Sequence, residues 1–129
     1  MSKVIDKNMI RDRALKLPVV TNEMYEKCNY ETREIVEEFF AAKSQLSKDT
    51  KVQYRSALNQ FVYWLHENAM DKPLHKVKKR DFVRFMSYLV NRGMSSSGLK
   101  FKKSAISSLC KYIEDNIVDD DDMPEFSRF

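Results

Sequence analysis

Glycine and proline are scarce in this chain of 129 residues, which has two glycines and three prolines. A protein rich in β-strands and tight turns needs more of both, so their scarcity favours an all-α fold. The sequence also lacks an apolar run of about eighteen residues, so no transmembrane helix is expected. Nothing after Met1-Ser2-Lys3 resembles the hydrophobic region of a signal peptide. These absences lead us to expect a cytoplasmic protein with no membrane partner.

Cysteine and histidine are also few, and their spacing indicates no chemistry. Cys28 and Cys110 are far apart and lack the Cys-x-x-Cys spacing of a metal or redox site, so we expect two reduced thiols. Neither His66 nor His75 has a partner one helical turn away that could complete a metal site, and a surface position is expected for His66. No metal, cofactor or catalytic residue is therefore predicted.

Charge is distributed unevenly along the chain. Residues 1–44 carry eight Lys and Arg and eight Asp and Glu, and residues 114–129 carry one against seven. Residues 45–113 carry fourteen basic residues against four acidic ones, a balance of +10. Such a local excess points to a polyanionic partner. A basic surface that is merely solvated would give the same count, and this alternative stays open.

Hydrophobic periodicity predicts four main helices, near residues 30–44, 48–68, 79–92 and 96–116. The second shows the apolar stripe of a core-facing helix in Tyr54, Leu58, Phe61 and Leu65. Asn29 is a candidate N-cap for the first helix, and Ser47 or Asp49 for the second. Gly93 would end the third helix in the left-handed conformation. The predicted architecture is a small four-helix bundle with an N-terminal extension.

Two of these helices carry cations away from their apolar stripes, near their starts. The last helix opens with three serines, of which capping explains only one, and free N–H groups at such an end bind phosphate readily. We therefore predict a DNA-binding surface, without catalytic or metal residues, made of Lys48, Lys51, Arg55, Ser96, Ser97, Lys100 and Lys103. Because Arg55 and Lys100 lie off the apolar stripes, both should be replaceable without loss of stability.

Two further groups of cations are unusual. Lys76, Lys78, Lys79 and Arg80 crowd the start of the third helix, where positive charge opposes the helix dipole and an anion is expected nearby. Asp81 would partly compensate. Lys102 lies near the apolar stripe of the last helix, so its stem is expected to extend across the bundle.

Several short stretches carry a resemblance to a known family. They are Leu46-Ser47-x-x-Thr50-x-x-x-Tyr54, Leu74-x-x-Val77, Asp81-Phe82-x-x-Phe85, Gly93-x-Ser95-x-Ser97 and Lys103-Ser-Ala-Ile106. Together they resemble the N-terminal, SAM-like core-binding domain of phage integrases, the tyrosine recombinase family. The chain departs from that pattern at Gly98 and at Lys78, where the family commonly has threonine.

The resemblance implies a small helical bundle that forms half of a clamp around duplex DNA, with catalysis supplied by a separate domain. It divides the chain into an N-terminal extension (1–28, partly helical or disordered), a helical core-binding domain (29–117) and an acidic exit linker toward an absent catalytic domain (118–129). A short helix is predicted over Val4–Leu17. It should end at Leu17 because Pro18 disfavours helical geometry in the residue before it. The extension could equally pack on the bundle or stay an arm.

The expected function is thus duplex DNA binding in site-specific recombination, in a bacterial or phage-infected host cell, by a chain that is not itself an enzyme. The implied partners are double-stranded DNA and the catalytic domain of a longer parent protein, with oligomerisation on DNA left open. Two alternatives are a helical protein–protein interaction module and a non-catalytic, recombinase-derived DNA-binding regulator. An interaction module would more naturally expose apolar residues than lysines.

Overall fold

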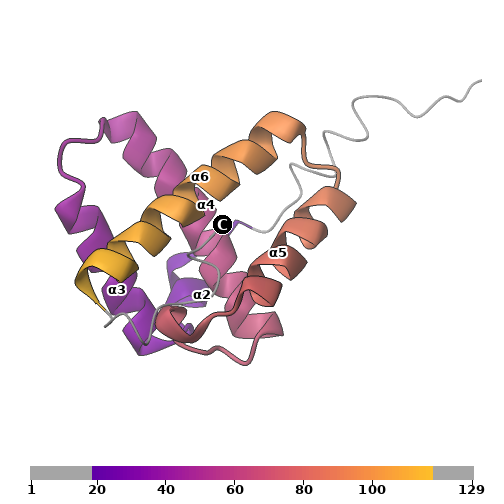
Figure 1. Cartoon of the computed structure of the whole chain (residues 1–129), viewed down its shortest axis with the longest axis horizontal. Helices are drawn as coiled ribbons and strands as arrows, with labels where there is room; N and C mark the ends of the chain where they lie inside the picture. The colour runs from indigo at the N-terminus through magenta and orange to yellow at the C-terminus, as the bar shows by residue number, and fades with distance from the viewer. Residues whose placement is uncertain (1–18, 118–129) are drawn as a thin grey trace, which may run out of the picture.

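The structure is a computed structural model that describes residues 19–117 (Figure 1). Its elements are α2 (Asn22–Glu26), α3 (Tyr30–Ala42), α4 (Lys48–Asn68), the 3-10 turn η1 (Leu74–Lys76), α5 (Lys79–Asn91) and α6 (Ser96–Asn116). Over this range there is no strand, so the predicted all-α fold is confirmed. The four predicted helices are present with ends that differ by at most two residues, whereas α2 and η1 were not predicted. The helix predicted over Val4–Leu17 and the acidic residues after Val118 lie outside the described part of the chain.

The helix ends follow the local sequence signals. Asn29, Ser47 and Ser95 each accept, with a side-chain oxygen, the backbone N–H three residues further on. Ser47 rather than Asp49 therefore caps α4. Gly93 follows α5 with a φ of 84°, a left-handed conformation that glycine adopts without steric penalty.

The core lies around α4, which packs most extensively on α6. In Figure 1, α6 crosses α4, with α3 and α5 on either side. Leu58, Phe61 and Leu65 of α4 are buried, while Tyr54 is partly buried against the same core. The fully buried side chains that face them from the other helices include Val36, Phe39, Phe85, Leu89, Ile106, Leu109 and Ile113.

The connector between α4 and α5 closes one end of the bundle. Leu74 and Val77 are buried there. The backbone N–H of Asn29 donates to Asp71 Oδ1 at 2.9 Å, and that of Leu74 donates to the buried Thr32 Oγ1 at 3.1 Å. These bonds tie the connector to the start of α3. None of the helices in residues 19–117 is long and apolar enough to cross a membrane.

Candidate nucleic-acid interface

The first turns of α4 present two of the predicted lysines to solvent. Ser47 Oγ accepts the N–H of Thr50 at 3.2 Å, which starts the helix directly before Lys48. Lys48 is exposed and Lys51 is partly exposed. Both lie at the end of α4 where the helix dipole is positive, so their charge and the free N–H groups act on the same region of space.

The first turns of α6 carry the other predicted residues. Ser95 is the N-cap, with Oγ accepting the N–H of Gly98 at 3.1 Å. The two serines that capping leaves over, Ser96 and Ser97, are exposed, as are Lys100 and Lys103. No aspartate or glutamate occurs in residues 82–113, so no carboxylate on α6 before Glu114 offsets these cations.

Gly98 explains one departure from the family pattern. A Cβ atom at this position would lie 2.9 Å from Cγ of Met94, closer than unstrained atoms approach. A threonine here would require Met94 to move. The position of the Met94 side chain in this structure therefore depends on Gly98 having no Cβ atom.

Two contacts join the N-terminal half of α6 to α4, one to the first half of α4 and one just past its middle. The rings of Tyr54 and Phe101 meet edge to face with centroids 5.5 Å apart. Lys102 extends across the bundle, as expected, and its Nζ donates to Gln60 Oε1. Burial lowers the pKa of this ammonium. Figure 1 shows that both helices start at the same edge of the molecule, diverging from their crossing point.

Arg55 belongs to a different environment from the lysines. Its Nη1 and Nη2 atoms donate to the two carboxylate oxygens of Glu37 at 2.6 and 2.8 Å, and its guanidinium lies 4.3 Å from the ring centroid of Phe40. The Tyr25 hydroxyl donates to Glu37 as well, at 2.9 Å. These contacts join α2, α3 and α4, so Arg55 has a packing role that its position off the apolar stripe did not indicate, and its replacement is now expected to cost some stability.

The ionisation of these groups reflects the same contacts. Hydrogen bonds from Arg55 lower the pKa of Glu37, and the bonds to Glu37 raise the pKa of Arg55. Burial, together with Glu37, raises the pKa of Tyr25 above its usual range. Sequence reasoning missed Glu37 and Tyr25, since neither is a neighbour of Arg55 along its own helix and no local pattern could have paired them.

The start of α5, which the remaining cations surround, lies toward the edge of the molecule opposite the starts of α4 and α6 (Figure 1). Asp81, the residue expected to compensate part of this charge, is 2% exposed. Asp81 Oδ2 accepts the N–H of Lys78 at 3.0 Å and a bond from Lys72 Nζ at 2.8 Å. Asp81 thus supplies a cap contact where the family pattern would place a threonine hydroxyl at Lys78. The side chains of Lys76, Lys79 and Arg80 are exposed.

Residues with reactive side chains are placed as follows. Cys28 and Cys110 are buried free thiols, and burial raises the pKa of Cys28 to about 11. His66 is half-buried rather than at the surface, with Nδ1 3.1 Å from Asp71 Oδ1. Among residues 19–117, no three His, Cys, Asp or Glu side chains lie close enough together to hold a metal ion.

Over most of its length the chain is similar to known proteins. Residues 32–120 match the family model described as phage integrase, N-terminal SAM-like domain. The chain is 50% identical over 121 residues to the SPbeta prophage-derived recombinase-like protein YomM of Bacillus subtilis (strain 168). The alignment covers 94% of this chain but 36% of that protein, so the chain spans about a third of the relative's length. No solved structure matches the chain.

Proposed function

Because the chain belongs to the family of phage integrase N-terminal SAM-like domains, we propose that it binds duplex DNA through the N-terminal halves of α4 and α6. The observation that carries this proposal is the exposed pair Lys100 and Lys103, on a helix without carboxylates before Glu114. The proposed setting is the cytoplasm of a bacterial or phage-infected cell, in site-specific recombination.

The two helix starts suit a phosphate backbone. Lys100 and Lys103 extend from α6 beside the exposed hydroxyls of Ser96 and Ser97, where first-turn N–H groups have no partner within the helix. Lys48 and Lys51 supply the second group of charges from α4 at the same edge. Such contacts position a protein on DNA without reading its sequence, so modest sequence preference is expected.

Arg55 has a secondary place in this proposal. Both of its terminal nitrogens are bonded to Glu37, so a phosphate would have to displace the carboxylate or accept a hydrogen bond from one of the three N–H groups that Glu37 leaves over. We therefore assign the principal contacts to the four lysines and treat Arg55 as a weaker contributor.

The other half of the DNA clamp would be a second domain of a longer protein. The family model describes an N-terminal domain and not a catalytic one, and the relative in Bacillus subtilis is much longer than this chain. We propose that these residues hold DNA while another part of a longer protein performs strand exchange. The 129-residue chain alone should then form no covalent adduct with DNA.

The direct test is the salt dependence of DNA affinity, measured by fluorescence anisotropy with a short duplex of mixed sequence. If each of the four lysines neutralises one phosphate, log K should fall against log salt with a slope of roughly −3 to −4. The absence of salt-dependent affinity would contradict the proposal.

A second candidate function is supported by the outer face of α5. Val83 and Val90 are 50% and 55% exposed and line one groove with Met86, an arrangement that suits a protein partner. Under this alternative, Val83→Asp with Val90→Asp would abolish an association while the lysines would be dispensable. A non-catalytic regulator descended from a recombinase would share the DNA-binding surface, so the anisotropy test applies to it equally.

A further inference from the structure

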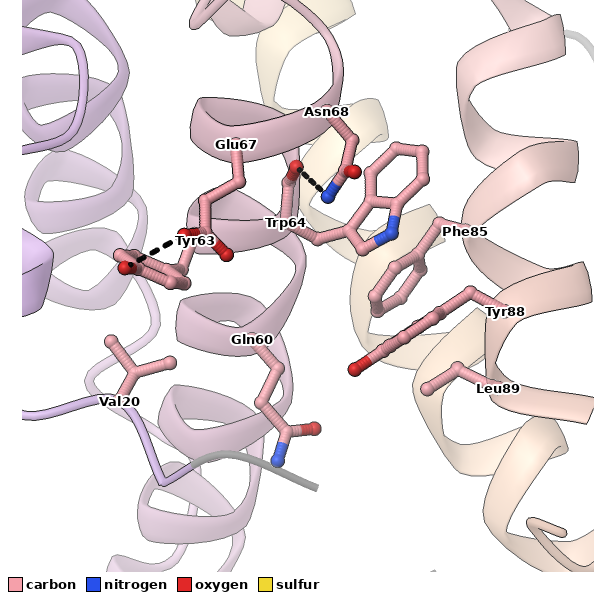
Figure 2. A pocket seen from close by; sticks show the side chains of 9 residues that line it. All are labelled: Val20, Gln60, Tyr63, Trp64, Glu67, Asn68, Phe85, Tyr88 and Leu89. Carbon is pink, nitrogen blue, oxygen red and sulfur yellow. Dashed lines mark hydrogen bonds between the residues drawn. The ribbon is translucent and has the colours of Figure 1, made fainter. Parts of the chain in front are cut away.

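A cavity of about 270 Å³ lies between α4 and α5, away from the starts of α4 and α6. Figure 2 shows its two sides: Val20 and Tyr63 on one, and Trp64, Phe85, Tyr88 and Leu89 on the other. These six are aromatic or aliphatic, and the other three residues that line the cavity, Gln60, Glu67 and Asn68, are polar. The cavity is at the lower limit for small-molecule pockets, which are typically about 300–1,000 Å³. An apolar cavity of about 150 Å³ holds one benzene-sized group, so this one suits roughly two aliphatic side chains.

The chain itself enters the described region at this cavity. Val20 precedes α2 and lines the cavity, so the residues before it leave from the cavity wall. Leu17 and Leu15 stand three and five residues before Val20. Even a fully extended chain keeps them within about 11 and about 18 Å of it, respectively.

The local sequence favours presenting both leucines on one side. Pro18 biases Leu17 toward extended backbone. Docking of both leucines requires the helix predicted over Val4–Leu17 to end before Leu15, because alternate side chains point the same way only in extended backbone. Arg13 and Lys16 flank them, and Glu67 is the one charged residue among those that line the cavity.

We propose that the α4–α5 cavity is the docking site of the chain's own N-terminal segment, with Leu15 and Leu17 seated between the two helices. The tether makes this docking intramolecular, so a modest contact is enough to keep the site occupied. The basic residues of the segment then lie beside Glu67. This assigns the extension to the bundle rather than to a free arm, and it is independent of where DNA binds.

Trp64 makes the proposal testable, because it is the chain's single tryptophan and lines the cavity. In the full chain, nuclear Overhauser effects should join the methyl groups of Leu15 and Leu17 to the Trp64 indole. Leu15→Ser with Leu17→Ser should remove them, move the Trp64 emission to longer wavelength and allow anilinonaphthalene sulfonate to bind. Circular dichroism verifies that the bundle remains folded.

The matched control is Val4→Ser with Ile5→Ser, which removes two aliphatic side chains from the same extension and should leave the Trp64 emission unchanged. Absence of the Overhauser effects in the wild-type chain would overturn the proposal. So would equal binding of the dye to wild type and to the leucine variant. If isotope-filtered spectra of a mixed sample show that the contacts join two molecules, the site binds a second copy and intramolecular docking is wrong.

Discussion

The two longest helices, α4 and α6, begin alike but use their cations differently. Each has 21 residues and a serine N-cap, and each carries basic residues in its first turns. Arg55 of α4 is bonded to Glu37 of the neighbouring α3, whereas Lys100 of α6 is exposed to solvent on a helix that has no carboxylate before Glu114. A cation on the polar face of a helix is therefore available to a ligand only if the adjacent element supplies no carboxylate.

The largest loss of stability should come from removing the buried Asp81 carboxylate, which is hydrogen-bonded within the bundle. Asp81→Ala removes the carboxylate that is bonded to Lys78 N–H and to Lys72 Nζ, and it leaves a mostly buried ammonium without its partner. We expect the free energy of unfolding to fall by about 3 kcal/mol. Urea titration measures this. An unchanged free energy of unfolding would show that the hydrogen-bonded Asp81 carboxylate contributes no more to stability than an exposed charge does.

The same carboxylate should give the stability a pH dependence. Burial raises the pKa of Asp81, but the hydrogen bonds from Lys72 and Lys78 together lower it by more. Its folded-state pKa therefore lies below the unfolded value of about 3.9. The stabilisation is then complete above about pH 4 and is lost as pH falls through the folded-state pKa. Asp81→Asn should show a smaller loss of stability on acidification than wild type. Parallel urea titrations at neutral and acidic pH provide the comparison.

The exposed lysines of α6 should show the opposite behaviour. Lys100→Glu with Lys103→Glu is expected to weaken DNA binding by about 10- to 100-fold, or roughly 1.4 to 2.8 kcal/mol. The salt slope should shrink by about one for each lysine. Stability should change by less than about 0.5 kcal/mol, because both side chains are at the surface.

A matched variant makes that result specific. Lys27→Glu with Lys111→Glu removes the same charge at exposed positions outside the two helix starts. It should bind DNA almost as well as wild type in the same anisotropy assay. Equal losses in both variants would mean that net charge, and not the start of α6, determines the affinity.

Arg55→Ala should lie between these extremes. It removes a bidentate bond to Glu37 and a contact with the Phe40 ring, and we expect a loss of about 1 kcal/mol in unfolding free energy. The value is modest because the Arg55 and Glu37 side chains are 35% and 53% exposed, and water screens the pair. DNA affinity should fall less than it does for Lys100→Ala. A larger loss than for Lys100→Ala would place Arg55 among the principal contacts.

The smallest effect tests whether Glu37 restrains Arg55. Glu37→Gln keeps the shape of the side chain but removes its charge, so the guanidinium can turn toward a phosphate. DNA affinity should rise by less than tenfold, an effect below about 1.4 kcal/mol, while stability falls slightly. The Arg55→Ala background supplies the control, because the gain should disappear there. A decrease in affinity on Glu37→Gln would contradict the distinction between α4 and α6.

The helices could be predicted from the sequence because their determinants are local. Apolar spacing, the caps at Asn29 and Ser47, and the stop at Gly93 all act within a few residues, and the structure contains each of them. Asp81 was also foreseen as a compensating charge, since it stands in the first turn of its own helix. The five residues of α2 were not, because so short a helix shows no periodicity, and its local signal is the N-cap Thr21, whose side chain accepts the N–H of Met24.

The candidate site was only partly predictable. The lysine positions follow from helical periodicity, which places them on the polar faces of α4 and α6. The engagement of Arg55 depends on how α3 packs beside α4, and the cavity between α4 and α5 depends on how two aromatic surfaces meet. Both depend on tertiary packing, which cannot be predicted from the spacing of residues within one helix.

The most direct test of the proposed DNA-binding surface is a titration of the isotopically labelled chain with an unlabelled duplex, followed through backbone amide chemical shifts. We predict saturable, salt-sensitive changes over residues 47–51 and 95–103, and little change over residues 31–38, where α3 exposes Glu31, Glu34, Glu37 and Glu38. Changes centred on the outer face of α5, or spread evenly over the molecule, would contradict the account.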